Sequence, residues 1–223
     1  MGTPRTRQAF SVEKAHNTQL KLARKIVFKD KIPKKIHLIA GVDVAYYKDR
    51  SIGATAVLDY DSLELIESQT AISKTLFPYI PTLLSFREIP PAVNSMRKLR
   101  SSPDVLLVDG QGYAHPYHCG FASHLGLAIN KPTVGVAKSR LYGEVERTQY
   151  KDFSVLKHGH EVIGAVIMTK RGSRPIYVSV GHMVSLEKAI EIVRHCISGS
   201  CVPKPILEAH RIATEEKQKL NNS

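Results

Sequence analysis

The spacing of apolar and polar residues along this chain predicts both strands and helices. Short aliphatic runs between turn residues are typical of strands, whereas apolar residues three and four positions apart are typical of amphipathic helices. On this basis we expect strands near residues 37–47, 52–59, 63–73, 104–109, 132–137, 161–169 and 175–181. We expect helices near residues 7–30, from Pro90 to about Arg100, and near 118–129, 186–198 and 205–219.

The order of these elements predicts an α/β fold. The first three strands follow one another across short turns and should form an antiparallel meander, and the later strands alternate with helices. Such an order favours a mixed central sheet, antiparallel meander plus parallel strands, flanked by helices, and this layout resembles the ribonuclease H-like architecture. Without a repeat, a low-complexity tract or a linker, residues 1–223 are expected to form a single domain.

Composition narrows the protein class. With 43% hydrophobic and 23% charged residues, the chain should fold around a sizeable core. It lacks a run of 18 apolar residues, and its basic start is not followed by an apolar segment, so neither a membrane span nor a signal peptide is expected. The three cysteines lack C-x-x-C spacing and are expected to be reduced thiols. We therefore expect a cytoplasmic monomer.

The charge balance points to a polyanionic partner. The chain has 32 Lys and Arg against 20 Asp and Glu, a net charge of +12. A basic surface gains affinity for nucleic acids by releasing counterions from phosphates, although the excess could also serve solubility alone. The basic residues suggest a long footprint, because they are spread over Lys21, Arg24, Lys25, Lys29, Lys31, Lys34, Lys35, Lys138, Arg140, Lys170, Arg171 and Arg174.

Two carboxylates stand out within apolar strands. Asp109 ends the run Val105–Val108, and Asp43 interrupts another strand-like run. A buried carboxylate is costly to desolvate, and two of them on one sheet form a natural site for a hard divalent cation such as Mg²⁺. An alternative for Asp43 is a buried side chain bonded to backbone amides. Paired metal-binding carboxylates favour phosphodiester chemistry.

Several ordered blocks resemble the endonuclease V family, and the resemblance runs from about residue 37 to 212. It implies a ribonuclease H-like fold and an enzyme that recognises deaminated bases, chiefly deoxyinosine. The family's reaction needs Mg²⁺ or Mn²⁺, cuts the second phosphodiester bond 3′ to the lesion, and leaves the altered base in place. The matching blocks are AGVDVAY (residues 40–46), PYIP (78–81), LLSFRE (83–88), VDGQG (108–112), AHP (114–116), GFASHLG (120–126) and GVAKS (135–139).

The resemblance also implies catalytic residues. Asp43, Glu88 and Asp109 match the family's acidic cluster and would bind metal, where two cations about 4 Å apart can serve both the attacking and the leaving oxygen. Glu88 could instead be a solvated residue at a helix start. Lys138 would hold the scissile phosphate or orient the attacking water. His210 occupies the position of a late fourth ligand or a partner of metal-bound water, although a histidine in a basic helix can also be a simple surface residue.

Tyr79 lies in a stiff segment between two prolines. Proline fixes its own φ and restricts the residue before it, so the tetrapeptide Pro78, Tyr79, Ile80 and Pro81 should be extended. Such a tip suits a wedge that enters a duplex and fills a vacated base position, which is its part in the family. The alternative is a tyrosine packed on the core.

A pocket for a single extruded base is expected beside the wedge, because an enzyme that reads one base must take it out of the stack. Glycines allow close approach of the backbone, although they often serve only as turn residues. The expected pocket residues are Leu84, Gly110, Gly112 and Gly120, with His115 and Ser139 as phosphate contacts or supporting residues.

Two other functions compete with a deoxyinosine-specific DNA nuclease. One is an endoribonuclease of the same fold that acts on inosine in RNA, and single-stranded DNA is also a conceivable substrate. The other is a nucleic-acid-binding module without catalysis. The clustered carboxylates argue against the second, because a pure binder gains nothing from negative charge facing phosphates.

Overall fold

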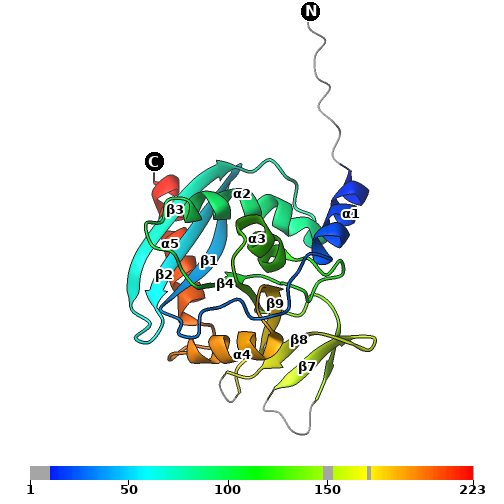
Figure 1. Cartoon of the computed structure of the whole chain (residues 1–223). Coiled ribbons are helices and arrows are strands. Elements are labelled where there is room, and N and C mark those ends of the chain that lie inside the picture. Colours follow the sequence, from blue (N-terminus) through cyan, green and yellow to red (C-terminus); the bar gives the residue numbers. More distant parts are fainter. Residues whose placement is uncertain (1–10, 148–152, 170–171, 223) are drawn as a thin grey trace, which may run out of the picture.

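In the computed structural model, which describes residues 11–147, 153–169 and 172–222, one nine-stranded sheet runs through the molecule (Figure 1). Its strand order is β3-β2-β1-β4-β5-β9-β8-β7-β6. The strands are β1 Leu38–Tyr47, β2 Arg50–Asp59, β3 Leu65–Lys74, β4 Val105–Asp109, β5 Thr133–Ala137, β6 Glu144–Glu146, β7 Ser154–His158, β8 Glu161–Ile167 and β9 Ile176–His182.

The sheet is mixed, as the sequence predicts. Strands β1, β2 and β3 form an antiparallel meander, and β1 then pairs in parallel with β4, which pairs in parallel with β5. From β5 onward the pairing is antiparallel through β9, β8, β7 and β6. The parallel pairing is thus limited to β1, β4 and β5. Two of these strands, β1 and β4, carry the candidate carboxylates Asp43 and Asp109.

Helices cover both faces of this sheet (Figure 1). The helices α2 and α3 pack on one face, whereas α4 and α5 pack on the other. A 3₁₀ turn, η1, precedes α2. The bounds are α1 Val12–Ala23, η1 Pro81–Leu83, α2 Leu84–Met96, α3 Phe121–Ile129, α4 Leu186–His195 and α5 Lys204–Asn221.

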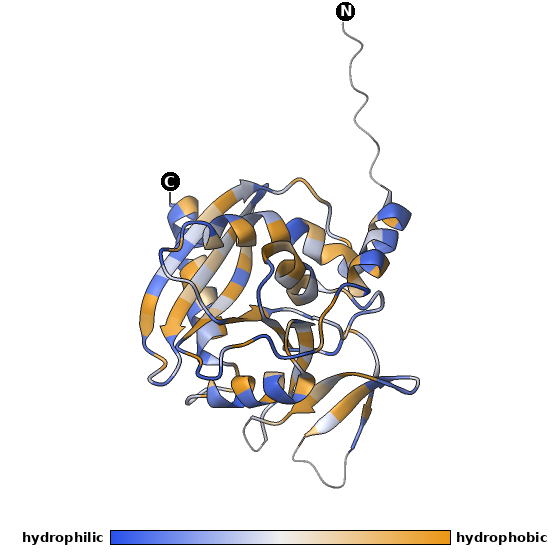
Figure 2. Ribbon diagram, viewed as in Figure 1, coloured by the Kyte–Doolittle hydropathy of each residue, from blue (hydrophilic) through white to orange (hydrophobic). Residues whose placement is uncertain are grey.

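Side chains of the central strands alternate between two cores. Ile39 and Leu107 belong to the core shared with α4 and α5, while Ala40 and Leu106 belong to the core under α2 and α3. Figure 2 shows apolar residues concentrated along the strands and along one side of helices such as α4. Because successive residues of a strand point to opposite faces, this alternation fixes the face to which each functional side chain points.

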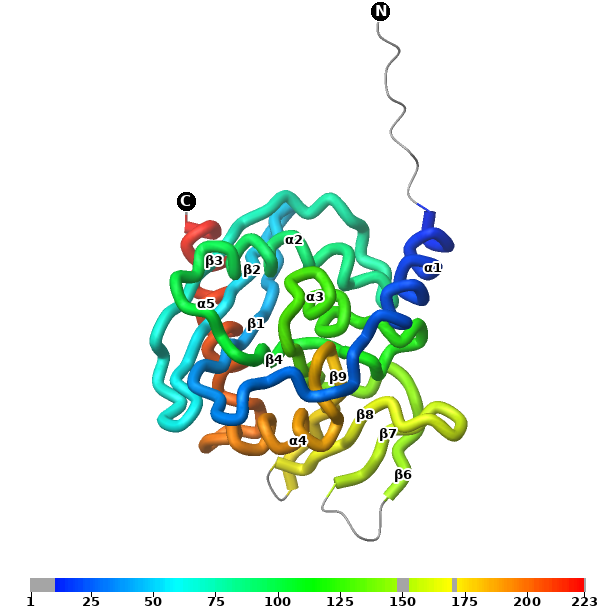
Figure 3. Tube along the Cα trace, in the orientation of Figure 1, coloured from blue at the N-terminus to red at the C-terminus, as the bar shows by residue number. Residues whose placement is uncertain are grey.

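The first helix is shorter than its predicted range of 7–30, of which residues 7–10 lie outside the described residues. It begins at Val12 behind Ser11, whose hydroxyl accepts a hydrogen bond from the Lys14 amide, and it ends at Ala23. The following segment crosses the molecule past the end of β9, where Val27 and Met183 are hydrogen-bonded (Figure 3). Of the apolar residues in this segment, Ile26 is buried, Val27 is half-buried and Phe28 is exposed.

The prediction that the second helix begins at Pro90 is wrong. Helix α2 begins at Leu84 and contains Pro90 and Pro91 in its interior. An interior proline removes a helical hydrogen bond and usually breaks the helix. Here Pro91 is buried, and its carbonyl lies close to Gly53 of β2. A Cβ built on Gly53 would come within 2.2 Å of the Pro91 carbonyl oxygen. This tight packing on β2 compensates for the lost hydrogen bonds.

Strands β6 and β7 were not predicted. All three residues of β6 are exposed, and its Glu-Val-Glu sequence carries no apolar run. Its existence depends on pairing with β7, in the register Glu144 opposite Lys157, and therefore on tertiary context.

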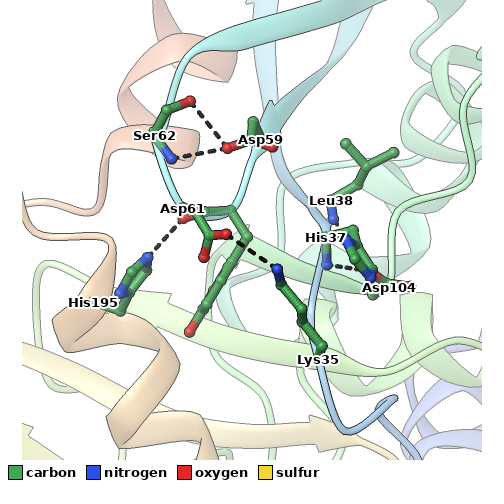
Figure 4. Close-up of polar contacts among 9 residues, drawn as sticks. Lys35, His37, Leu38, Asp59, Asp61, Ser62, Asp104 and His195 are labelled. Atoms are coloured by element: carbon green, nitrogen blue, oxygen red, sulfur yellow. Dashed lines mark hydrogen bonds and ion pairs between the residues drawn. The ribbon is translucent and has the colours of Figure 1, made fainter.

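A set of polar contacts closes the end of the sheet where β1 and β4 begin (Figure 4). The Asp104 carboxylate accepts hydrogen bonds from the amides of His37 and Leu38, which joins the starts of the two strands. His195 at the end of α4 contacts the Tyr60 carbonyl at 2.6 Å. These contacts serve the fold, and the candidate site lies at the opposite end of β4, beside the middle of β1.

Candidate active site

Strand register places Asp43 beside Asp109. The parallel pairing of β1 and β4 runs from Ile39 with Val105 to Val42 with Val108, so the next position in this register brings the two carboxylates together. Alternation from Ile39 and Leu107 directs both toward the face covered by α5. Asp43 is 9% exposed, and its Oδ1 accepts a hydrogen bond from the Val44 amide.

Helix α5 adds an imidazole to these carboxylates. His210 Nδ1 lies 2.8 Å from Asp43 Oδ2. The helix can approach so closely because β1 has a glycine beneath its first turn, where a Cβ on Gly41 would lie 1.8 Å from the Pro205 carbonyl oxygen. One helical turn later α5 presents His210 to the strand position two residues beyond Gly41.

Asp43, Asp109 and His210 together form a group suited to a metal ion, and we call it the metal cluster. One ligand atom from each residue lies within 4.8 Å of the others, and no other such group occurs in the described parts of the chain. Two carboxylates with one imidazole are a hard, mainly oxygen donor set that suits Mg²⁺ or Mn²⁺. The residues present therefore fit the divalent cation that the sequence led us to expect.

Lys138 lies beside the metal cluster, as the sequence analysis expected of a lysine at the end of this strand. It follows β5, and its Nζ is 2.6 Å from Asp109 Oδ2. Its side chain is half exposed, so it is also open to solvent and to a substrate. Asp109 has a pKa raised by burial and by the charge of Asp43, and the Lys138 ammonium opposes this rise.

Glu88, the third expected carboxylate ligand, lies outside the group of three residues whose ligand atoms are within 4.8 Å of one another. It comes from α2, on the opposite face of the sheet, where its Oε1 accepts a hydrogen bond from the Tyr46 hydroxyl at 3.2 Å. Burial, reinforced by the charges of Asp43 and Asp109, raises the pKa of Glu88 to about 8. His210 belongs to that group because α5 covers the face to which both aspartates point.

A cavity of about 260 Å³ opens next to these residues, with Glu88 in its wall. This volume lies just below the usual range of small-molecule sites, about 300–1,000 Å³, and suits a group the size of one nucleobase. The cavity wall contains three of the four expected pocket residues, Leu84, Gly110 and Gly120. It also contains both expected supporting residues, His115 and Ser139, and two residues of the expected wedge, Tyr79 and Pro81.

Three expected residues lie elsewhere. Gly112 is not part of the cavity wall, because it lies against β9, where a Cβ would come within 2.2 Å of the Val180 carbonyl oxygen. Pro78 and Ile80 are also absent from the wall, and of the Pro78–Pro81 segment only Tyr79 and Pro81 border the cavity. The Tyr79 side chain is 68% exposed, so it is not packed on the core.

Two glutamines in the cavity wall were missed by the sequence analysis. Gln111 lies within the motif VDGQG, and its Nε2 donates to the Ser139 carbonyl at 2.9 Å. Gln19 comes from α1 and is fully buried. Gln19 follows the apolar Ala15 by one helical turn and therefore lies on the same side of α1. This spacing was the signal available in the sequence.

Known proteins similar to this chain show which family it belongs to. A model of the family described as Endonuclease V matches residues 20–211. The chain belongs to the endonuclease V family. An endonuclease V of Thermofilum pendens is 42% identical over 215 residues, which cover 96% of this chain and 92% of that protein. One of Trichormus variabilis is 40% identical over 208 residues, covering 92% and 94%.

Solved endonuclease V structures share the fold. The enzyme from Streptomyces avermitilis superimposes with a TM-score of 0.88 at 31% identity over 95% of both chains. That of Ciona intestinalis, in complex with a 23-mer DNA containing an inosine followed by a ribo-adenosine, gives 0.84 at 29% identity, covering 95% of this chain and 100% of that one. The ribonuclease H-like fold is thus confirmed, and the protein is a DNA-repair nuclease that acts on DNA and depends on metal.

None of the helices described in this endonuclease V is long and apolar enough to cross a bilayer. The basic α5, the longest of them, has 18 residues, but charged residues occur along its whole length.

His115 supports the cavity as a neutral group. Its ring is buried, and its Nδ1 accepts a hydrogen bond from the Tyr117 amide at 3.1 Å. Burial lowers the pKa of His115 to about 4, and burial likewise lowers that of His124 to about 4. A neutral imidazole is a weak partner for phosphate, which favours the supporting role that the sequence analysis left open.

We expect these histidines to make stability depend on pH. Because the unfolded chain binds their protons near pH 6.5 and the folded chain only near 4, stability is greatest above pH 6.5 and falls as pH drops toward 4. His115→Asn should remove on the order of 2–3 kcal/mol of this dependence. Urea unfolding at pH 7, 6, 5 and 4 measures it. The same substitution at the exposed His160 should leave the slope unchanged, and an unchanged slope in His115→Asn would contradict the assignment.

Proposed function

We propose that this endonuclease V recognises deaminated bases, chiefly deoxyinosine, in double-stranded DNA and hydrolyses the second phosphodiester bond 3′ to the lesion. The reaction would require Mg²⁺, with Mn²⁺ as a substitute, and would leave a nick with the altered base in place. The observation that carries the proposal is the position of the metal cluster beside a cavity the size of one base.

Each part of the site has a distinct task in this proposal. Asp43, Asp109 and His210 would hold the cation, which supplies a nucleophilic hydroxide and stabilises charge on the leaving oxygen when bound. Lys138, already paired with Asp109, offers a positive charge for the scissile phosphate. Glu88 is proposed as a further carboxylate ligand, because the charges of Asp43 and Asp109 raise its pKa and its buried Oε2 has no hydrogen-bond partner within the described residues.

The lesion is recognised by extrusion in this proposal. Leu84, Gly110 and Gly120 would enclose the flipped base, with His115 and Ser139 supporting the wall. Tyr79 stands exposed at the rim of the same cavity and would fill the vacated position in the duplex. The net charge of +12 would bind the flanking phosphates over a long footprint.

In this proposal the whole chain forms one domain. It acts as a monomer in the cytoplasm. In support, one sheet contains every described strand, and all three cysteines are free, with Cys119 and Cys196 buried as thiols.

A nicking assay tests the function directly. Matched duplexes carrying one deoxyinosine or one deoxyadenosine should be cut only in the first case and only with Mg²⁺ or Mn²⁺, and sequencing gels locate the cut. A matched RNA duplex tests the second candidate, an inosine-specific endoribonuclease, which the ribo-adenosine in the Ciona complex favours. A higher rate on RNA would reassign the substrate, and cutting of both DNA duplexes alike would overturn lesion specificity.

Tyr79→Ala should weaken binding to inosine-bearing duplexes by about tenfold, because base stacking on an aromatic ring contributes roughly 1–3 kcal/mol. Binding to unmodified duplexes should change little, since no base leaves the stack there. Fluorescence anisotropy on both duplexes measures this, and Tyr79→Phe serves as the control that keeps the ring. Equal losses on the two duplexes would refute insertion coupled to the lesion.

A further inference from the structure

Tyr46 lies on the face of β1 opposite to that of Asp43. Ala40 and Val42 of this strand belong to the core under α2 and α3, and strand alternation directs Tyr46 to the same side. Its hydroxyl donates a hydrogen bond to Glu88 Oε1 on α2, at 3.2 Å. Strand β1 therefore carries one carboxylate of the metal cluster and contacts Glu88 from its other face.

The ring of Tyr46 is also held by α2. The Arg87 guanidinium carbon lies 4.1 Å from the centroid of the ring, which is a cation–π contact. Arg87 and Glu88 are consecutive residues of α2, so the ring and the hydroxyl of Tyr46 both contact the same turn of that helix. Two contacts to one turn make the half-buried phenol a well-ordered donor.

Only one oxygen of Glu88 has a partner of this kind. Glu88 lines the cavity, and its buried Oε2 makes no hydrogen bond within the described residues. The terminal torsion of a glutamate has a broad distribution, so a carboxylate without an anchor samples many orientations. The hydrogen bond to Oε1 restricts that rotation and leaves Oε2 available as a ligand atom.

We propose that Tyr46 is a positioning residue of the metal site, because its hydroxyl fixes the orientation in which Glu88 meets the divalent cation. The inference rests on the proposed function, in which Glu88 is a further ligand. Groups that hold a ligand without touching the metal commonly change metal affinity or activity by about 10- to 100-fold when they are removed. Tyr46 is not part of the cavity wall, so its loss should weaken binding of the cation rather than of DNA.

Tyr46→Phe tests the hydroxyl alone, because it keeps the ring that contacts Arg87. Electron paramagnetic resonance of free Mn²⁺, measured without DNA, should show an affinity about tenfold weaker than that of the unmodified protein. In single-turnover nicking, the Mg²⁺ concentration for half-maximal rate should rise by a similar factor, while the rate at saturating Mg²⁺ falls less than about threefold. The Kd for deoxyinosine DNA should not change.

A matched control removes the same kind of bond elsewhere. The Tyr113 hydroxyl donates to Glu161 Oε1 at 2.7 Å, and neither residue lines the cavity. Tyr113→Phe should keep the Mn²⁺ affinity and the Mg²⁺ requirement of the unmodified protein. Urea unfolding without metal verifies that both variants fold. Lower stability of Tyr46→Phe with an unchanged Mn²⁺ affinity would show that the bond only joins α2 to β1, and would overturn the proposal.

A double-mutant cycle shows whether Tyr46 acts through Glu88. Glu88→Gln should itself weaken Mn²⁺ binding, because it removes a charged oxygen ligand. Adding Tyr46→Phe to Glu88→Gln should change the affinity by less than about twofold, since the hydroxyl no longer has a carboxylate to position. A further loss as large as that of Tyr46→Phe alone would show that the hydroxyl acts by another route, which also contradicts the proposal.

The outcomes separate this inference from the proposed function. Because the Mn²⁺ measurement uses no DNA, it tests Tyr46 even if the unmodified protein fails to cut deoxyinosine DNA, a failure that would overturn the proposed function. Unchanged Mn²⁺ affinity in Glu88→Gln would overturn Glu88 as a ligand and the role of Tyr46 with it. Weaker binding in Glu88→Gln but not in Tyr46→Phe would overturn the role of Tyr46 alone.

Discussion

Asp109→Asn will reduce nicking of deoxyinosine DNA by about a thousandfold or more, because it removes a charged ligand from the metal cluster. The fold should survive, since Asn has the same shape and the change relieves the repulsion from Asp43 that raises the pKa of Asp109. Single-turnover nicking in Mg²⁺ measures the loss. Thermal unfolding with and without Mn²⁺ should show a stabilising shift in the unmodified protein and almost none in the variant.

Asp104→Asn is the matched control for this experiment. It makes the same substitution at the opposite end of the same strand, where the carboxylate accepts the amides of His37 and Leu38 (Figure 4). It should lower stability slightly and retain nicking. Full nicking by Asp109→Asn, or an unchanged Mn²⁺ shift, would contradict the assignment of the metal cluster.

Gly41→Ala will destabilise the protein by roughly 3 kcal/mol or more, because the new methyl group would lie 1.8 Å from the Pro205 carbonyl oxygen and must displace α5. The displacement moves His210 away from Asp43, so Mn²⁺ affinity and nicking should fall together. Urea unfolding gives the stability and a thermal-shift titration with Mn²⁺ gives the affinity.

Gly159→Ala provides the comparison, because it lies in an open turn with nothing within 4 Å of the added Cβ. With a φ of +58° it should cost only the strain of a left-handed backbone, about 1–2 kcal/mol, and leave nicking intact. Similar losses at the two glycines would show that α5 is not held by contact with β1.

The sequence predicted the central strands and their carboxylates because each part of that signal is local. A short aliphatic run that ends in Asp109 identifies a buried strand and a costly charge without knowledge of its neighbours. The pairing of Asp43 with Asp109 also followed, since adjacent central strands bring such residues to one edge. The matching family motifs strengthened both predictions.

The proximity of His210, rather than Glu88, to both aspartates could not be predicted from sequence. It depends on which helix covers which face of the sheet, and that is decided by packing, including the close contact between Gly41 and Pro205. The interior prolines of α2 illustrate the same limit, because local rules place proline at a helix start and only burial against β2 tolerates it later. Gln19 was missed because its partners, Thr82 and Cys119, lie 63 and 100 residues away.

The separation of His210 from Asp43 has a consequence for protein synthesis. The two residues are 167 positions apart, so at roughly 5–20 residues per second the ribosome adds the imidazole on the order of ten seconds or more after the first aspartate. A nascent chain or a fragment that stops before α5 can expose basic segments to DNA but lacks one of the three ligands. We expect such a fragment to lack nicking activity, because its metal cluster is incomplete.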